Sequence, residues 1–289
     1  MPNHVASLLV CGATFRGLAA AAAAAQAGLD VIVIERSALV GHEYIDAFHP
    51  GSRYGAPRTA LARAFQADAR ARNLQEEGGP LHLPALHPLL CALIKRSGLD
   101  VRFLTELVGI TAGEEIYRIE IADAAGLHEL RASRILDTTS TRLSTPGEPA
   151  WPDAARLNAY VHGGASTDGQ ASPAALPPLF DERLQVRQGR YPAERIVGLE
   201  LPPTSSWQEA RAALYSLWAS RPEAWRPWTI AATAGAFEVR PAQTAQRLHE
   251  RWTWEPSAAA DNPLAALDAG ARLFGTREAK GHATVSTEK

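Results

Sequence analysis

The sequence has 289 residues, of which 46% are hydrophobic, so it can bury the core of one large domain or two modest ones. Its formal net charge is -2 with the charges interspersed, and the lack of a basic block excludes the usual signature of nucleic-acid or membrane-surface binding. Two cysteines are too few for a disulfide-rich secreted fold, and no uncharged apolar stretch reaches membrane-spanning length. We therefore expect a cytoplasmic protein that binds neither nucleic acid nor membrane.

The first stretch with a clear pattern, residues 8–35, predicts a strand, a glycine turn, a helix and a second strand. The apolar run 8–10 and the β-branched run 31–34 are typical of strands that are buried on both faces. The alanine-rich run 18–27 predicts the helix between them. This order is that of the dinucleotide-binding unit of a doubly wound α/β fold with a parallel sheet.

The turn and the acid that follows the second strand predict contacts with a nucleotide. Gly12 and Gly17 have the spacing of the outer glycines in GxGxxG, and Glu35 can accept both hydroxyls of an adenosine ribose. The middle glycine is replaced by Thr14, whose β-branched side chain would intrude where backbone normally approaches a pyrophosphate. The unit therefore either binds a dinucleotide or keeps the packing of such a unit without its ligand.

Further elements of the first half follow in chain order. The polar loop 36–55 contains His42 and Glu43, and we interpret it either as solvated or as passing the edge of a flavin or substrate. Beyond it we expect helices over 57–75 and 89–96, a strand over 101–104, a three-stranded antiparallel meander over 107–110, 115–122 and 127–132, and a buried strand over 134–137.

The stretches LLVCGATFRGLAAA, LHPLLCALIKRSGLDVRFLTELVGI and ASRILDTTS resemble FAD-dependent oxidoreductases of the two-dinucleotide-binding class. The resemblance implies that the first unit holds the ADP half of FAD and that the meander is the insertion typical of this family. It also implies an Asp-Ala-Thr-Gly-like motif after the meander, where Asp137 and Thr139 match and Ser140 replaces the glycine. NAD is a weaker alternative to FAD, because Glu35 would suit either ribose.

The C-terminal stretch AGARLFGTREAKGHATVST resembles the flavin-contacting segment of the family, where a strand leads into a glycine-rich loop. The matching positions are Gly270, Gly275, Thr276, Arg277, Glu278 and Gly281. In the family a helix follows, and its dipole faces the flavin pyrimidine. We expect this helix to be missing here, which would leave an apolar edge for a partner subunit to cover.

The residues expected to contact the cofactor come from these motifs, and Arg16 is expected to offset the lost glycines by pairing with a phosphate. They are Gly12, Ala13, Thr14, Arg16, Gly17, Glu35, Arg36, Asp137, Thr139, Gly275, Arg277 and Gly281. We assign no catalytic residue, because a flavin itself carries out hydride transfer. Metal-ligand spacing is absent from the sequence.

The domain organisation follows from these assignments and from a change of composition. We expect a dinucleotide-binding domain over 1–150, completed by 255–289, and a smaller α+β substrate or cap domain over 151–254. Residues 144–178 are interpreted as a linker or as an irregular excursion from the first domain. Beyond it we expect strands over 184–186, 195–201 and 228–239, and an amphipathic helix over 243–251. We also expect a helix over 206–220 with Ser205 or Ser206 as its N-cap and Glu209 placed for a capping box.

Two functions of different kinds remain open at this point. The first is an FAD-dependent oxidoreductase that acts on an unknown small-molecule substrate. The second is a catalytically degenerate subunit that serves as a binding or scaffold partner, which Thr14, Ser140 and the missing helix would favour.

Overall fold

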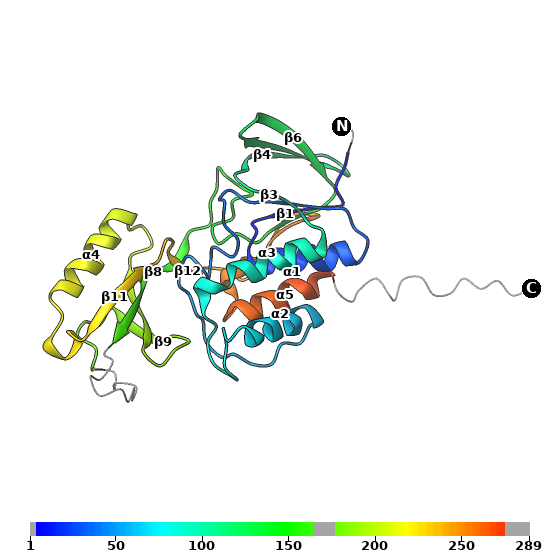
Figure 1. The fold of residues 1–289 in the computed structure, drawn as a ribbon. Helices are drawn as coiled ribbons and strands as arrows, with labels where there is room; N and C mark the ends of the chain where they lie inside the picture. Colours follow the sequence, from blue (N-terminus) through cyan, green and yellow to red (C-terminus); the bar gives the residue numbers. More distant parts are fainter. Residues whose placement is uncertain (1–3, 164–176, 275–289) are drawn as a thin grey trace, which may run out of the picture.

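The computed structural model describes residues 4–163 and 177–274, which form a larger α/β unit and a smaller unit built on a second sheet (Figure 1). The larger unit contains a six-stranded sheet with the strand order β13-β14-β7-β1-β2-β3. Its strands are β1 (Leu8–Cys11), β2 (Val31–Ile34), β3 (Asp100–Arg102), β7 (Ile135–Asp137), β13 (Gln246–His249) and β14 (Trp252–Trp254). All neighbours pair in parallel except β13 and β14, so the central strands end at one edge of the sheet.

Different layers cover the two faces of this sheet because successive side chains of a strand point to opposite sides. Leu8, Val10 and Val33 pack against one helical layer, whereas Leu9, Cys11 and other alternate residues pack against a meander. The helices are α1 (Phe15–Gln26), α2 (Ala60–Ala71), α3 (His87–Ser97) and α5 (Pro263–Phe274), and the meander strands are β4 (Glu106–Ala112), β5 (Tyr117–Asp123) and β6 (Gly126–Ala132). The predicted α/β class with a parallel sheet and a three-stranded meander is confirmed.

The smaller unit is an antiparallel sheet with the order β11-β8-β10-β9, to which β12 adds by pairing with β8. Its strands are β8 (Pro152–Gly163), β9 (Leu184–Gln188), β10 (Glu194–Leu201), β11 (Trp228–Thr233) and β12 (Glu238–Pro241). Helix α4 (Trp207–Ala219) packs on this sheet through Leu214 and Trp218. The predicted capping box with Glu209 is present, and Ser206 rather than Ser205 is the N-cap. Short 3-10 turns occur as η1 (Leu83–Ala85), η2 (Glu223–Trp225) and η3 (Ser257–Ala259).

Three predicted elements differ from the structure. Residues 243–251 do not form an amphipathic helix, because β13 pairs with β14 at the edge of the first sheet. Both strands precede residue 255, so the larger unit takes up chain that we had assigned to the second domain. The expected linker contains β8, the strand with which β10, β11 and β12 all pair.

A helix forms where we expected a strand that leads into a flavin-contacting loop. The helix that we expected to be missing would follow this loop, and its position lies outside the described residues. Helix α5 lies along α1, and Gly270, which was predicted to start a flavin-contacting loop, lies within this helix. The apolar edge for a partner subunit depends on the helix expected to be missing, and it stays a prediction. The positions Gly275, Arg277 and Gly281, with Thr276 and Glu278, lie outside the described residues.

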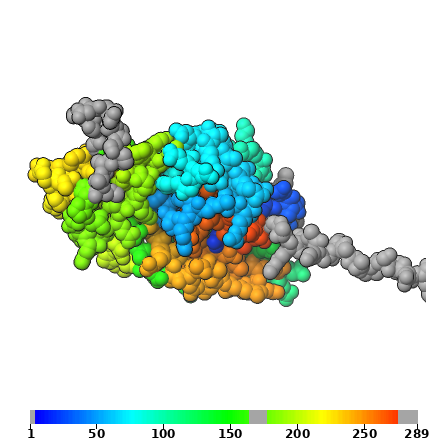
Figure 2. Space-filling model, turned by 90° about the horizontal axis from the view of Figure 1, so that it is seen from below, coloured from blue at the N-terminus to red at the C-terminus, as the bar shows by residue number. Residues whose placement is uncertain are grey.

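The end of the described chain returns to the beginning. In the space-filling view, orange atoms from the later part of the chain lie against blue atoms from its first part (Figure 2). The hydroxyl of Tyr44 donates to the Ser257 carbonyl at 2.9 Å, and the side-chain amide of Asn262 donates to the Ser52 carbonyl at 2.7 Å. None of the helices within 4–163 and 177–274 is both long and apolar enough to cross a membrane.

Candidate cofactor site

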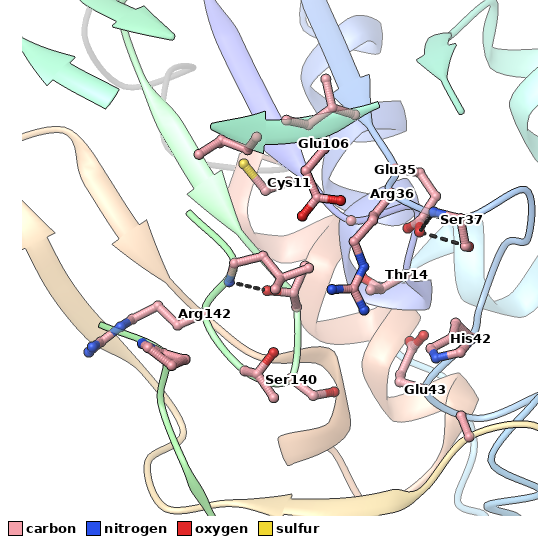
Figure 3. Close-up of a pocket in the computed structure, with 18 of the residues that line it drawn as sticks. Cys11, Thr14, Glu35, Arg36, Ser37, His42, Glu43, Glu106, Ser140 and Arg142 are labelled. Carbon is pink, nitrogen blue, oxygen red and sulfur yellow. Dashed lines mark hydrogen bonds between the residues drawn. The ribbon is translucent and has the colours of Figure 1, made fainter. Parts of the chain in front are cut away.

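A cavity of about 690 Å³ opens at the carboxyl ends of β1, β2 and β7, on the side that faces the smaller unit (Figure 3). The larger unit contributes the glycine turn, residues 34–37 after β2 and residues 139–143 after β7. The smaller unit contributes Trp207 and Phe237. This is the position at which open α/β sheets bind nucleotides, and the volume lies within the usual range for small-molecule sites.

The two outer glycines of the turn are required by close packing, as the motif predicts. Gly12 has a φ of +97°, and a Cβ atom there would lie 2.9 Å from the methyl group of Thr139. A Cβ atom on Gly17 would lie 2.3 Å from the Gly12 carbonyl oxygen, which is too close for any side chain. The turn thus brings the start of α1 against the ends of β1 and β7.

Thr14, at the position of the middle glycine, acts as the N-cap of α1. Its hydroxyl accepts a hydrogen bond from Gly17 N at 2.9 Å and lies 2.7 Å from the Thr138 hydroxyl. The hydroxyl is therefore engaged within the protein, although the residue also borders the cavity. Thr14 thus replaces a glycine of the motif with a helix cap.

We expect Thr14→Val to lower the free energy of unfolding by about 1 kcal/mol, because it keeps the branched shape and removes the cap. Thr14→Ser, which keeps the hydroxyl, is the matched control and is expected to stay close to the wild type. Denaturant unfolding measures the free energy of unfolding of both variants. An equal loss of stability in the two would argue against a capping role.

Glu35 lies at the wall of the cavity with both carboxylate oxygens fixed. One oxygen accepts from Ala13 N at 2.9 Å, and the other accepts from the amide and the hydroxyl of Ser37, each at 2.8 Å. These bonds set the orientation of the carboxylate at the end of β2, where the sequence predicts a ribose contact (Figure 3).

Arg36 follows Glu35 and borders the same cavity. Its guanidinium extends toward the side of Thr14 and Glu43 (Figure 3). Among the described residues, no carboxylate lies within salt-bridge distance of Arg36. A cation with no carboxylate partner in the described part of the chain therefore faces the cavity near the start of α1.

Arg16, which we expected to pair with a phosphate, points elsewhere. Its guanidinium is buried and lies 3.4 Å from the carboxylate of Glu255, and the residue does not border the cavity. Burial lowers the pKa of Arg16, and the nearby Glu255 partly offsets this effect. In this structure the side chain joins α1 to the segment after β14.

Asp137 holds the loop after β7 in place through hydrogen bonds, and it does not line the cavity. One carboxylate oxygen accepts from the amide and the hydroxyl of Thr139, at 2.8 and 2.6 Å, and the other accepts from Ser144 N at 2.8 Å. Burial raises the pKa of Asp137, while these hydrogen bonds lower it. The adjoining residues Thr139 and Ser140 do border the cavity.

The sequence places Glu43 only in a polar loop. In the structure this loop folds back, and the Glu43 side chain contacts the first turn of α1. One of its oxygens, Oε1, accepts from Phe15 N at 2.9 Å and from the Ser257 hydroxyl at 2.6 Å. Burial raises the pKa of Glu43 to about 7, against the lowering effect of these bonds and of His42. The sequence signal was weak, since it consisted of two titratable residues in a loop after a strand.

A comparison with protein families identifies the first half of the chain. Residues 7–141 match the model of a family described as FAD dependent oxidoreductase. This part of the chain contains the glycine turn, Glu35, the meander and the Asp137 motif, so the resemblance seen in the sequence is confirmed and FAD is supported as the cofactor.

Solved structures of other proteins share this fold. The structure of p-nitrophenol 4-monooxygenase PnpA from Pseudomonas putida DLL-E4 is 17% identical with a TM-score of 0.57, over 92% of this chain and 76% of that enzyme. Aklavinone-11 hydroxylase, solved with FAD and aklavinone, is 16% identical with a TM-score of 0.56, over 95% of this chain. AlpK is 19% identical with a TM-score of 0.54, over 92% of this chain.

The chain spans only part of some of these proteins, namely 60% of AlpK and 62% of aklavinone-11 hydroxylase. At such identities the likeness shows the fold. No curated protein sequence matches the chain.

The residues present fit FAD. Gly12 and Thr14 bring the turn before α1 to the cavity wall, Glu35 is oriented at this wall, and Arg36 supplies a cation. Within the described residues, Thr14 N has no protein acceptor and can donate to a phosphate oxygen. No group of three or more His, Cys, Asp or Glu residues in 4–163 and 177–274 is arranged to bind a metal ion.

Proposed function

We propose that the protein binds FAD in this cavity and acts as a flavin-dependent oxidoreductase on an apolar small molecule. Glu35 would accept the ribose hydroxyls, and Arg36 with Thr14 N would bind the pyrophosphate. The observation that carries the proposal is one continuous cavity, which reaches from Glu35 at the end of β2 to Trp207 and Phe237 of the smaller unit.

The flavin, when bound, supplies the hydride transfer, and the chain supplies binding and orientation. Trp207 and Phe237 pack edge to face with their ring centroids 5.3 Å apart, and with Val239 they give the smaller unit's side of the cavity an apolar surface. Such a surface binds apolar rings and excludes water. The hydroxylase and monooxygenase activities named for similar structures also support oxidation of an organic small molecule.

The direct test is a titration of the purified protein with FAD. We expect the bound protein to absorb near about 450 nm and to quench flavin fluorescence. A protein that stays colourless and leaves the fluorescence of added FAD unchanged at every concentration tested would contradict the proposal.

We expect Arg36→Gln to raise the Kd for FAD by about tenfold, which corresponds to roughly 1.4 kcal/mol, because the pyrophosphate loses a cation. Arg131→Gln is the control of equal charge change, since Arg131 pairs with Glu129 on the meander and does not border the cavity. Fluorescence titration measures both variants. Equal affinities for FAD in the two variants would show that Arg36 does not contribute to FAD binding.

A second candidate, a protein that binds partners without turnover, is favoured by one observation. Four amides at the start of α1 already donate to side chains of this chain, namely those of Ala13, Phe15, Arg16 and Gly17. Failure to bind FAD in the titration would favour this candidate. A cytoplasmic location belongs to either proposal and rests on the low cysteine content.

A further inference from the structure

A carboxylate of the protein itself lies where α1 would interact with an anion. Glu43 is 6% exposed, borders the cavity, and accepts a hydrogen bond from Phe15 N in the first turn of the helix. The start of a helix attracts negative charge through its free amides and its dipole. Glu43 thus uses an interaction that a bound pyrophosphate would also use.

Only half of this carboxylate is satisfied. Oε1 accepts from Phe15 N and from the Ser257 hydroxyl, whereas the buried Oε2 has no hydrogen-bond partner within 4–163 and 177–274. An ionised carboxylate with a buried, unpartnered oxygen is costly, and a neutral carboxyl group reduces that cost. The geometry therefore tolerates a protonated Glu43 better than an ionised one.

The charged groups around Glu43 do not neutralise it. His42 lies 3.1 Å from Asp46 in the same loop, and Arg16 of α1 points to Glu255 rather than to Glu43. The titratable and charged groups that face this region are His42, Tyr44 and Asp46 of its own loop, Arg16 of α1, Glu255 before η3, and Glu35 and Arg36 after β2.

We propose that Glu43 occupies the anion position at the start of α1 in the free protein, and that binding of FAD requires this carboxylate to take up one proton from solvent. The inference rests on the proposed function. An ionised Glu43 and a pyrophosphate would repel each other across a poorly solvated cavity, which disfavours their coexistence. Protonation removes that charge and turns Oε2 from an acceptor into a donor.

The expected result is an affinity that depends on pH through Glu43 alone. Because burial raises the pKa of Glu43 to about 7, this carboxyl group changes its charge between pH 6 and pH 8. We expect the Kd of the wild type for FAD to rise about tenfold over this range, from about pH 6 to about pH 8. Glu43→Gln is expected to show no such rise and to bind FAD more tightly than the wild type at the higher pH.

Proton uptake gives a second readout that a merely structural role would not change. Calorimetric titration with FAD near pH 8, in two buffers of different ionisation enthalpy, should show uptake approaching one proton per bound FAD in the wild type. The uptake should be close to zero in Glu43→Gln.

The neighbouring His42 provides the matched control. Its hydrogen bond to Asp46 raises the pKa of His42, so the contribution of His42 must be separated from that of Glu43. We expect His42→Gln to retain the pH dependence and the proton uptake of the wild type. Loss of both in His42→Gln, or their persistence in Glu43→Gln, would overturn the inference.

The test separates this inference from the proposed function. If FAD binds to the wild type and to Glu43→Gln with the same dependence on pH, only the role of Glu43 fails. If neither protein binds FAD at any pH, the proposed function and this inference fail together. Binding by Glu43→Gln under conditions where the wild type does not bind supports both.

Discussion

Glu238→Gln is expected to lower the free energy of unfolding by about 3–5 kcal/mol, because it removes the shared anion of a buried charge network. Glu238 lies on β12 and accepts from Arg156 on β8 at 2.5 Å, from Arg187 on β9, and from the Asn158 amide at 2.7 Å. Both guanidiniums are mostly buried, with side chains 17% and 21% exposed. Without the carboxylate they would remain in the protein without their anion.

The network also joins the two units of the structure. The Asn158 side chain that donates to Glu238 donates in addition to the Ala47 carbonyl at 2.7 Å, in the loop after β2. Phe237 and Val239, on either side of Glu238, border the cavity. We therefore expect Glu238→Gln to weaken FAD binding as well as folding.

Glu200→Gln is the matched control for Glu238→Gln. Glu200 lies 3.9 Å from the same Arg156, but its side chain is 53% exposed. Exposed ion pairs contribute little, so the control should change stability by less than about 1 kcal/mol. Denaturant unfolding near neutral pH compares the two variants. Similar losses of stability in the two variants would show that the buried network contributes no more to folding than a surface ion pair.

Acid should weaken the wild type through the same carboxylate. Burial alone would raise the pKa of Glu238, but His49, Arg187 and Arg156 bring it down to about 2. A folded-state pKa below the unfolded value gives stability that is present above about pH 4.5 and is lost as the pH falls toward about 2. Glu238→Gln should lack this part of the acid sensitivity in unfolding experiments.

The elements that the sequence predicted correctly depend on local patterns. The alanine-rich run before Gly28, the alternation in the meander and the capping box at Ser206 each specify an element within a few residues. Glu35 could be placed at the cavity for the same reason, because the end of β2 follows from the strand pattern and the fold places strand ends at the site.

The elements that were missed depend on pairing between distant parts of the chain. Strand β14 is stable because it pairs with β7, more than a hundred residues earlier, and its own three residues carry little information. Strand β8 contains three alanines and begins with a proline, and it becomes the centre of a sheet only through β10, β11 and β12.

The errors in the predicted site have the same origin. The glycine motif places Arg16 at the start of α1 but does not fix the direction of its side chain, which Glu255 determines from 239 residues away. Glu43 likewise meets α1 only because its loop folds back and Ser257 comes from the C-terminal part of the chain. Such contacts follow from the fold and could not be predicted from spacing.

Gly270→Ala is expected to lower the free energy of unfolding by about 2–3 kcal/mol, because it forces α1 and α5 apart. A Cβ atom at this position would lie 2.1 Å from the Arg16 carbonyl oxygen and 3.1 Å from the Ala19 Cβ. The nearest atom belongs to the backbone, so no side-chain rotation can relieve the clash. Helix propensity alone predicts the opposite sign, a gain of up to about 1 kcal/mol for alanine over glycine within a helix.

This variant separates helix packing from the flavin contact that the sequence suggested for Gly270. A packing role predicts a loss of stability in the absence of FAD, and weaker FAD binding because the start of α1 shifts. A flavin contact alone predicts weaker binding with unchanged stability of the free protein. Gly109→Ala is the control, because a Cβ atom on Gly109 meets nothing within 4 Å. Thermal unfolding of both variants without FAD distinguishes the two roles, and a Gly270→Ala protein as stable as the control would refute the packing of α5 on α1 described here.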